Sequence, residues 1–422
     1  MVPTRTLPLP PAADRSFPLA LVIWAALGIA LNVGLSRFTY GIMLPGVKHD
    51  LGLGYAGAGL IHAIHLGGYM VGTLVAPMLG KRLGMGALAR RGHWLVAAGA
   101  VLCAVVPAGM AGGPYLLGFG RLVTGMAGGA GVVAAFVIVL AAVPAGASAT
   151  VSAVVWGASG AVVLLSAAAA SPLARGLDGE WRIVFWLTAA VAVWVAANTP
   201  SMAGQAAPVA AARQHSPADA APPAVRWYFL LAAGFCFGAG YIGFATFLGS
   251  RVLDAHAGSG LLGLTWAVFG LAMIAGATLT VSVMRTKALA PYAFAGANGA
   301  GLLGAMVAAS GSWHAALVGV LLVGSTVAAG PAILTSYTRQ RCSAQAYARR
   351  FGYVSGAVCL GQLVGPVLTG VLTDHMGTQA VPLVAMALYA AATVFALLDR
   401  SFGVPDVDAR NDRRFASGRG GR

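Results

Sequence analysis

Hydrophobic stretches long enough to cross a lipid bilayer alternate with short polar connections along the whole chain. About 20 apolar residues span roughly 30 Å of hydrocarbon, so a chain of 422 residues has room for about a dozen such helices. Hydrophobic residues make up 59% of the chain and charged residues only 9%, whereas about a quarter of the residues in a soluble domain are charged. The sequence therefore predicts an all-α, polytopic membrane protein.

The hydrophobic pattern predicts twelve spans, an even number that places both termini on the same side of the membrane. The expected spans are 19–46, 56–79, 93–111, 115–142, 149–172, 183–199, 227–249, 259–284, 289–309, 314–338, 350–372 and 379–398.

Lys and Arg are unevenly distributed over the connections between these spans. With the N-terminus in the cytoplasm, 20 of the 26 Lys and Arg residues lie in the two tails and in every second connection. This distribution follows the positive-inside rule. It predicts a multi-pass protein of the bacterial cytoplasmic membrane with both termini in the cytoplasm. The net charge of +15 is spread over these loops, so we expect the lipid bilayer, and not nucleic acid, as their partner.

A segment rich in Pro, Ala and polar residues at 200–226 divides the twelve spans into six and six. Span 1 (GLSRFTYGIMLP) aligns with span 7 (GAGYIGFATFLG), which places Arg37 opposite Tyr241, and span 2 aligns with span 8, which places His65 opposite Trp266. Such a repeat predicts two pseudo-symmetric six-helix bundles with a site between them. The expected units are a tail (1–18), a bundle (19–199), a linker (200–226), a second bundle (227–399) and a basic tail (400–422).

Several motifs resemble those of a known family, the major facilitator superfamily. GRLVTGMAGGAG in the fourth span is similar to the Arg-x-x-x-Gly signature of that superfamily, and DGEWRIVFW is similar to its fifth-to-sixth connection. More narrowly, SRFTYGIMLPGVKHDLGL, GGYMVGTLVAPML and GYIGFATFL resemble the YbfB/YjiJ-like branch. The resemblance covers nearly the whole chain. It implies a transporter with no cofactor and no enzymatic activity, which works by alternating access around a cavity lined by spans 1, 4, 7 and 10.

The loop after span 2 departs from the superfamily pattern. The pattern there is Gly-x-Leu-x-Asp-Arg-x-Gly, and PMLGKRLG places Lys81 at the position of the aspartate, followed by Arg82 and Gly84. We expect this loop to act in gating, but without the usual carboxylate lock between the halves. The later copy GVLTDHMG keeps Asp374, which falls on the opposite side of the membrane and is not expected to replace the missing aspartate.

All 11 acidic residues fall in loops, tails or helix ends, so the ionisable side chains considered inside the expected spans are two Arg and two His residues. Arg37, Arg121, His62 and His65 lie about 10–14 Å from the outer ends of their spans by helix rise, so they could meet near the midplane. A buried Arg without a counter-charge costs roughly 2.5 kcal/mol or more, and its planar fork suits an anionic substrate group. Alternatively, Arg37 bonds to backbone carbonyls or to polar side chains such as Asn32 and only fixes helix packing. For Arg121, coupling or gating is favoured over substrate contact.

His62 and His65 are three residues apart and share a helix face. A free imidazole has a pKa of about 6.5, so a pair of histidines that faces the cavity could carry a proton. The alternative is a pair that is only hydrogen-bonded to hydroxyls or carbonyls. Two ligands do not complete a metal site, so no metal is expected.

Further residues are candidates for contact with a solute. Tyr241, Trp266, Tyr69 and Tyr40 could stack on a planar part of a substrate, although simple packing is the alternative for each. Gln362 is a polar residue in an apolar span and needs hydrogen-bond partners. Four glycine pairs are expected to let helices approach closely: Gly68/Gly72, Gly125/Gly129, Gly352/Gly356 and Gly361/Gly365.

These features predict a monomeric secondary active transporter of a small organic solute, with an anion as one option. Protons are the expected driving partner because the sequence has no phosphate-binding loop for ATP. A proton-driven multidrug or metabolite efflux pump is the alternative within the same class. A non-transporting solute sensor or a histidine–metal membrane enzyme is disfavoured, because the eight histidines leave a single HxxH pair and the tails contain no signalling module.

Overall fold

The computed structural model describes residues 18–143, 148–169, 180–199, 227–256, 259–286, 288–340 and 344–399. Apart from Pro18, the predicted tails (1–18 and 400–422) and the predicted linker (200–226) lie outside the described residues.

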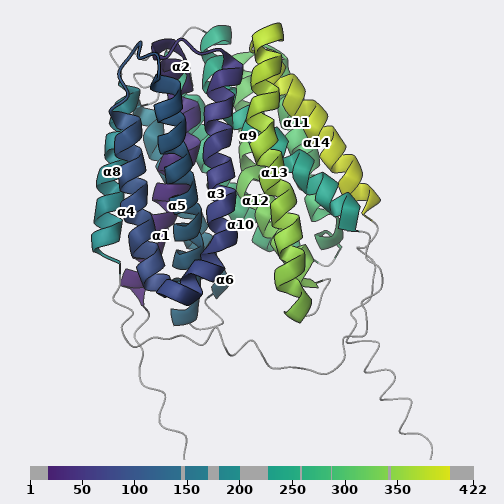
Figure 1. Cartoon of the computed structure of the whole chain (residues 1–422). Helices are drawn as coiled ribbons and strands as arrows, with labels where there is room; N and C mark the ends of the chain where they lie inside the picture. The colour runs from purple at the N-terminus through teal and green to yellow at the C-terminus, as the bar shows by residue number, and fades with distance from the viewer. Residues whose placement is uncertain are drawn as a thin grey trace, which may run out of the picture.

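The first half of the chain forms six helical segments that run roughly parallel (Figure 1). The first segment is continuous and consists of α1 (Leu19–Ile29), a π-helix η1 (Ala30–Phe38) and α2 (Thr39–Asp50). It is followed by α3 (Tyr55–Leu83), α4 (Met85–Ala104), α5 (Gly113–Ala142), α6 (Ser148–Ser166) with the 3₁₀ turn η3 (Ala167–Ala169), and α8 (Trp181–Ala197).

The second half forms six further helices beside the first six (Figure 1). They are α9 (Trp227–His256), α10 (Ser259–Arg285), α11 (Ala293–Ala309) preceded by the 3₁₀ turn η6 (Ala290–Tyr292), α12 (Trp313–Gln340), α13 (Ala344–Met376) and α14 (Ala380–Leu398). The predicted order and number of twelve spans are confirmed.

The limits of some spans differ from the prediction. Nine of the described helices are long and apolar enough to cross a membrane. Helix α4, which forms the third span, begins at Met85, directly after Gly84, and ends at Ala104, whereas the sequence predicts a span at 93–111. Arg90 and Arg91 therefore lie inside α4 and not in a loop. The helical hydrogen bonds continue through these polar residues, which the hydrophobic pattern alone excludes from the span.

Large apolar side chains cover the outer surface of the helices. Leu74 of α3, Leu165 of α6 and Leu279 of α10 are 64%, 75% and 63% exposed. Apolar exposure on this scale is unfavourable in water and normal for a surface that contacts lipid.

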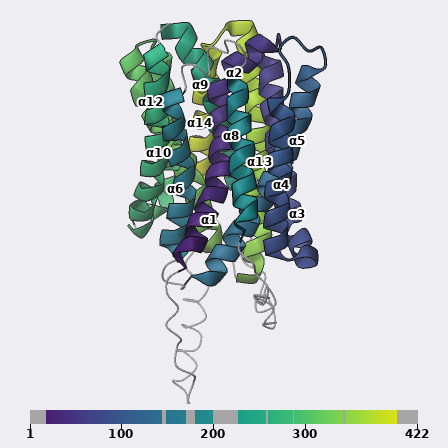
Figure 2. The same cartoon turned by 90° about the vertical axis from the view of Figure 1, so that its left-hand side faces the viewer.

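The two bundles meet along three helix pairs: α3 with α13, α6 with α10, and α2 with α9. Figure 2 shows α6 beside α10. In Figure 1, α3 and α13 lie close together at the top and diverge toward the bottom. We call the top the Asp374 end, because α13 ends there, and the bottom the terminal end, because α1 begins there.

Glycines bring the backbones of the two bundles into contact toward the Asp374 end. A Cβ atom at Gly59 of α3 would lie 2.4 Å from the Pro366 carbonyl oxygen of α13, and one at Gly370 would lie 2.6 Å from the Tyr55 carbonyl oxygen. Only residues without a side chain fit at such distances. The closed state of this end therefore depends on these glycines.

Three of the four predicted glycine pairs lie in tight helix contacts, Gly68/Gly72 and Gly125/Gly129 between α3 and α5, and Gly361/Gly365 between α13 and α9. For the fourth pair, the prediction was wrong. A Cβ atom at Gly352 or Gly356 would have no described atom within 4 Å, because this stretch of α13 lies toward the terminal end, where α3 has diverged from it.

Candidate functional site

Arg37 lies in the last turn of a π-helix in the middle of the first span. All nine residues of η1 are buried, and Arg37 itself is only 6% exposed. A π-helix is wider than an α-helix and occurs frequently at functional sites. The sequence does not predict it, because the apolar run continues through residues 30–38 without a break that would mark a change of helix type.

A hydrogen bond joins Arg37 to the opposite bundle. Its Nη2 donates to the hydroxyl oxygen of Tyr241 on α9 at 2.6 Å, and the Gln362 Nε2 of α13 donates to the same oxygen at 2.7 Å. The repeat alignment places Arg37 and Tyr241 at equivalent positions of the two halves, and the structure brings these positions into direct contact.

Asn32, the alternative partner of Arg37, lies elsewhere. Its amide nitrogen donates to the Gly28 carbonyl at 2.8 Å and lies 3.4 Å from the His93 Nε2. Asn32 is therefore not the polar side chain that bonds to Arg37, and Tyr241 takes that place. Asn32 is one helical turn earlier in chain position, and its side chain is already bonded within the first bundle.

Aromatic rings surround the Arg37 guanidinium. Its Cζ lies 5.4 Å from the ring centre of Phe38, 5.9 Å from that of Tyr69 and 6.0 Å from that of Tyr241. These rings come from η1, α3 and α9. Cation–π attraction stabilises the charge in the apolar interior by about 0.5–2 kcal/mol per well-placed ring. The Arg37 Nε has no hydrogen-bond partner among the described residues.

Arg121 is held inside the first bundle. Its Nη1 donates to the Ser36 backbone carbonyl, and its Cζ lies 4.8 Å from the ring centre of Tyr40. The side chain is completely buried. Arg121 therefore ties α5 to the residue that precedes Arg37, so its contacts position Arg37 and do not reach the other bundle.

His62 and His65 lie on α3 with ring centres 6.5 Å apart. The His62 Nδ1 lies 2.9 Å from the Thr246 Oγ1, and that hydroxyl donates its proton to the Ile242 carbonyl. The His62 Nδ1 must therefore be the donor. The His65 Nδ1 donates to the Arg121 carbonyl at 3.1 Å. In both neutral rings the Nε2 is then the free acceptor, and neither Nε2 has a partner among the described residues.

The His62 contact also crosses the bundle interface, since Thr246 belongs to α9. His62 lies beside Tyr40 as well, with ring centres 4.9 Å apart. Within the described part of the chain, no three His, Cys, Asp or Glu side chains are grouped in a way that could hold a metal ion.

Trp266 of α10 packs against Phe269 and the first span. It is completely buried, and its ring packs edge-on against Phe269 at 5.5 Å, which in turn lies 6.1 Å from Phe38. A Cβ atom at Gly41 would meet the Trp266 ring at 2.9 Å. Trp266 therefore packs against the first span directly after the π-helix.

The predicted gating loop forms the end of α3 at the terminal end. Lys81 and Arg82 are exposed in the last helical turn. Gly84 has φ of 83°, a left-handed conformation that favours glycine, and α4 begins at the next residue. The loop is thus a turn of one residue between two helices.

Asp374 lies at the opposite end of the same interface. Its carboxylate accepts hydrogen bonds from the backbone N–H groups of Tyr55 at 2.7 Å and Ala56 at 2.9 Å, the first two residues of α3. The carboxylate of one bundle therefore caps a helix of the other. The sequence gives no sign of this contact, because the two partners are more than 300 positions apart.

A second network joins helices at the Asp374 end within the first bundle. Asp50 accepts from the Trp181 Nε1 at 2.8 Å and pairs with Arg182 at 2.9 Å. Arg182 also donates to the Val106 carbonyl. These contacts hold the ends of α2 and α8 together and so fix the outer rim of the bundle.

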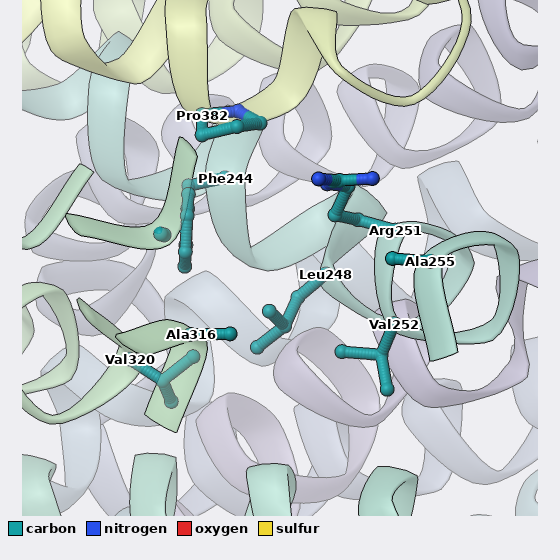
Figure 3. A pocket seen from close by; sticks show the side chains of 9 residues that line it. Phe244, Leu248, Arg251, Val252, Ala255, Ala316, Val320 and Pro382 are labelled. Atoms are coloured by element: carbon teal, nitrogen blue, oxygen red, sulfur yellow. The ribbon is translucent and has the colours of Figure 1, made fainter. Parts of the chain in front are cut away.

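A small pocket lies in the second bundle, and Arg37 is not among the residues that line it (Figure 3). Arg251 and apolar side chains from α9, α11, α12 and the start of α14 line it, and its volume is about 20 Å³. A cavity of this size has room for about one water molecule. It is too small for an organic solute. The candidate site is the contact between Arg37 and Tyr241, which rests on the hydrogen bond between the two bundles.

The fold is similar to that of several solved transporters. The xylose transporter XylE from E. coli has a TM-score of 0.70 at 14% identity, with 93% of this chain and 99% of that chain covered. The nucleoside transporter NupG has a TM-score of 0.71 at 12% identity, with 91% and 100% covered. A bacterial homologue of the human lysosomal transporter Spinster, in an inward-facing and occupied conformation, has a TM-score of 0.66 at 14% identity, with 92% and 98% covered.

At these identities the likeness establishes the fold alone. A search of curated protein sequences gives no significant match. The model of the family described as "Uncharacterised MFS-type transporter YbfB" matches residues 29–399. Its members are carriers and not enzymes, and the chain belongs to this family of major facilitator transporters.

Proposed function

We propose that the protein is a secondary active transporter that carries a small organic anion by alternating access and couples this movement to protons. The hydrogen bond between Arg37 and Tyr241 carries the proposal. It places a buried cation at the contact between the two bundles, where a carried solute must bind to be reached from either side.

The charge of Arg37 supports an anion as the solute. The described acidic residues Asp50, Glu180, Asp254, Asp374 and Asp399 all lie at or near helix ends. No carboxylate in the described part of the chain faces the guanidinium at mid-membrane depth. A buried charge in an apolar bundle needs a counter-charge, and a solute anion supplies it each time the site is occupied.

The neutral tautomers of His62 and His65 support proton coupling. Each ring presents a free Nε2 acceptor in the buried interface. The positive charges of Arg37 and Arg121 both act on His62. An anion beside Arg37 offsets the charge that a proton on His62 adds, so anion and proton bind more favourably together than alone.

Alternating access follows from the uneven contact between the bundles. The close backbone approaches of α3 to α13 described above involve Gly59, Gly370 and Tyr55, all in the half near the Asp374 end. With both termini in the cytoplasm, this is the state closed toward the outside. Rocking of the bundles about the Arg37–Tyr241 level would open the Asp374 end and close the terminal end. We also propose that the protein acts in the bacterial cytoplasmic membrane, because its Lys and Arg follow the positive-inside rule, and as a monomer, because one chain supplies both bundles.

Thermal stability of the detergent-purified protein tests the proposal first. Panels of organic anions, organic cations and neutral solutes are compared at pH 6 and pH 8 for wild type and Arg37→Ala. We expect stabilisation by anions that disappears in Arg37→Ala. Stabilisation by cations or apolar compounds that is unaffected by the substitution would contradict the proposal and indicate multidrug-type export.

Transport itself is then measured in proteoliposomes with the stabilising anion. We expect uptake to be faster with an inwardly directed proton gradient and to persist as slower exchange without it. Equal rates with and without the gradient would contradict proton coupling while leaving anion transport intact.

A further inference from the structure

We infer that the solute is a monocarboxylate with a planar, apolar body, and that its carboxylate bridges Arg37 of the first bundle and the Tyr241 hydroxyl of the second. This inference rests on the proposed function, because it names the class of anion that the same site carries. Three observations lead to it: the hydrogen bonds of Tyr241, the number of available charges, and the surrounding side chains.

The hydrogen bonds of Tyr241 leave a donor free. Its oxygen accepts from Arg37 at 2.6 Å and from Gln362 at 2.7 Å. A phenol carries one proton and two lone pairs, so both lone pairs are used and the hydroxyl proton is not. The buried Nε–H of Arg37 has no partner among the described residues either. Two unused donors therefore lie on the two partners of one hydrogen bond.

These donors suit a carboxylate. Its two oxygens accept hydrogen bonds in parallel, and Arg binds carboxylates in this bidentate way. One oxygen can take the Arg37 Nε–H and the other the Tyr241 O–H once the direct contact between the two side chains opens. The bound carboxylate then replaces a contact between the bundles with a bridge between them. Occupancy of the site is thereby linked to the closure of the bundles.

The charge at the site favours one negative charge over two. Arg37 supplies one positive charge. Arg121 is completely buried in the first bundle, where it donates to the Ser36 carbonyl and lies over Tyr40. Its Nε and Nη2 have no partner among the described residues, but the contacts it makes to Ser36 and Tyr40 lie within the first bundle, so Arg121 does not bridge the two bundles. A dianion would bring a second charge into an apolar interior without a partner, and nothing would offset the desolvation penalty of that charge.

The side chains around Arg37 favour an apolar, planar body. Phe38, Tyr69 and Tyr241 place ring centres within 6.0 Å of the guanidinium carbon. Phe237 extends this surface, with its ring centre 5.0 Å from that of Tyr241. Aromatic rings stack on flat apolar groups. A sugar would need several hydrogen-bonding side chains, and an amino acid would bring its ammonium group close to the positive charge of Arg37, which repels it. Gln362 is the amide side chain that contacts this cluster.

Calorimetric titration of the detergent-purified, full-length protein tests the inference with benzoate as the probe. Benzamide has the same shape without the charge, phthalate adds a second carboxylate, and phenylalanine adds an ammonium group. Tyr241→Phe removes the hydroxyl and keeps the ring. Tyr389→Phe is the matched control, since its hydroxyl bonds to Thr326 inside the second bundle. The thermal midpoint of each variant without ligand shows whether it folds.

We expect benzoate to bind wild type and Tyr389→Phe equally. Binding should be roughly tenfold weaker in Tyr241→Phe, as for the loss of one hydrogen bond to a charged group. It should be undetectable in Arg37→Ala. Benzamide, phthalate and phenylalanine should each bind at least about tenfold more weakly than benzoate. Each of them leaves one buried charge or polar group without a partner, and that weakens binding by about this factor.

Three outcomes would overturn the inference. Tighter binding of phthalate or of a phosphate ester, dependent on Arg37, would reject the monocarboxylate class and leave organic-anion transport standing. Equal binding of benzoate to Tyr241→Phe and Tyr389→Phe would reject the bridging hydroxyl. Binding of neutral or cationic compounds alone, unchanged in Arg37→Ala, would reject both the inference and the proposed function. If Arg37→Ala fails to fold, Tyr241→Phe carries the comparison.

Discussion

The carboxylate of Asp374, at the end of α13, accepts a 2.7 Å hydrogen bond from the backbone N–H of Tyr55, the first residue of α3. Ala56 donates a second bond at 2.9 Å. The first N–H groups of a helix have no partner within the helix and carry a partial positive charge. Asp374 satisfies two of them across the bundle interface, so this contact favours the state in which the Asp374 end is closed.

Asp374→Ala is expected to open this end. A carboxylate at an exposed helix N-terminus contributes about 1 kcal/mol, so the closed population should fall roughly fivefold relative to the open one. Double electron–electron resonance between spin labels at His49→Cys and His375→Cys, which are exposed on the two bundles at this end, measures the change after the native cysteines are replaced. Glu180→Ala removes a carboxylate at the same end and should leave the distances unchanged. An unchanged distance distribution in Asp374→Ala would contradict the role of Asp374.

Gly370→Ala should open the same end for a steric reason. The added Cβ would lie 2.6 Å from the Tyr55 carbonyl oxygen, and backbone atoms at such a distance must move apart. The same pair of spin labels should therefore report longer distances. Gly356→Ala is the control on the same helix, because no described atom lies within 4 Å of its Cβ position. If both variants keep the wild-type distances, α3 and α13 are not in the close contact described above.

His62→Gln is expected to separate solute transport from proton movement. The amide can still donate a hydrogen bond to Thr246 but cannot take up a proton. Anion exchange in proteoliposomes should continue, whereas acceleration by an inward proton gradient should be lost. His93→Gln replaces a buried histidine of α4 that contacts Asn32 and should retain the acceleration. A normal response to the gradient in His62→Gln would assign the proton to another group.

Arg121→Lys should destabilise the first bundle although it keeps the charge. Lysine lacks the planar guanidinium that lies 4.8 Å from the Tyr40 ring centre while donating to the Ser36 carbonyl. We expect a loss of about 2 kcal/mol in stability, which is measured as a lower thermal midpoint in detergent. Arg91→Lys, at an exposed position of α4, should have little effect. A midpoint equal to that of wild type would show that the Arg121 contacts are not needed to hold η1.

Much of the fold can be predicted from the sequence because the bilayer limits the choice of structure. The lengths of the apolar runs predict twelve helices, and the alternation of basic loops predicts on which side of the membrane each helix begins. The limits of α4 are less predictable. Arg90 and Arg91 interrupt the apolar run, yet the helix includes them, because helical hydrogen bonding does not end where the hydrocarbon ends.

The candidate site is predictable in composition and not in geometry. The scarcity of charge in the spans singles out Arg37, and the internal repeat pairs it with Tyr241. The π-helix that carries Arg37 has no local sequence signal. The partners of Arg121 and Asp374 are backbone groups, the Ser36 carbonyl and the Tyr55 N–H. Backbone groups are the same in every residue, so no sequence pattern identifies them as partners.

Exchange of an organic anion across proteoliposome membranes, compared between wild type and Arg37→Ala, tests the central claim most directly. Radiolabelled benzoate inside and outside the vesicles, without a proton gradient, isolates the carrier step from its driving force. Arg37→Lys shows whether charge alone is sufficient. We expect rapid exchange in wild type, much slower exchange in Arg37→Lys and background exchange in Arg37→Ala. Exchange of this or any other organic anion at the wild-type rate in Arg37→Ala would contradict this claim.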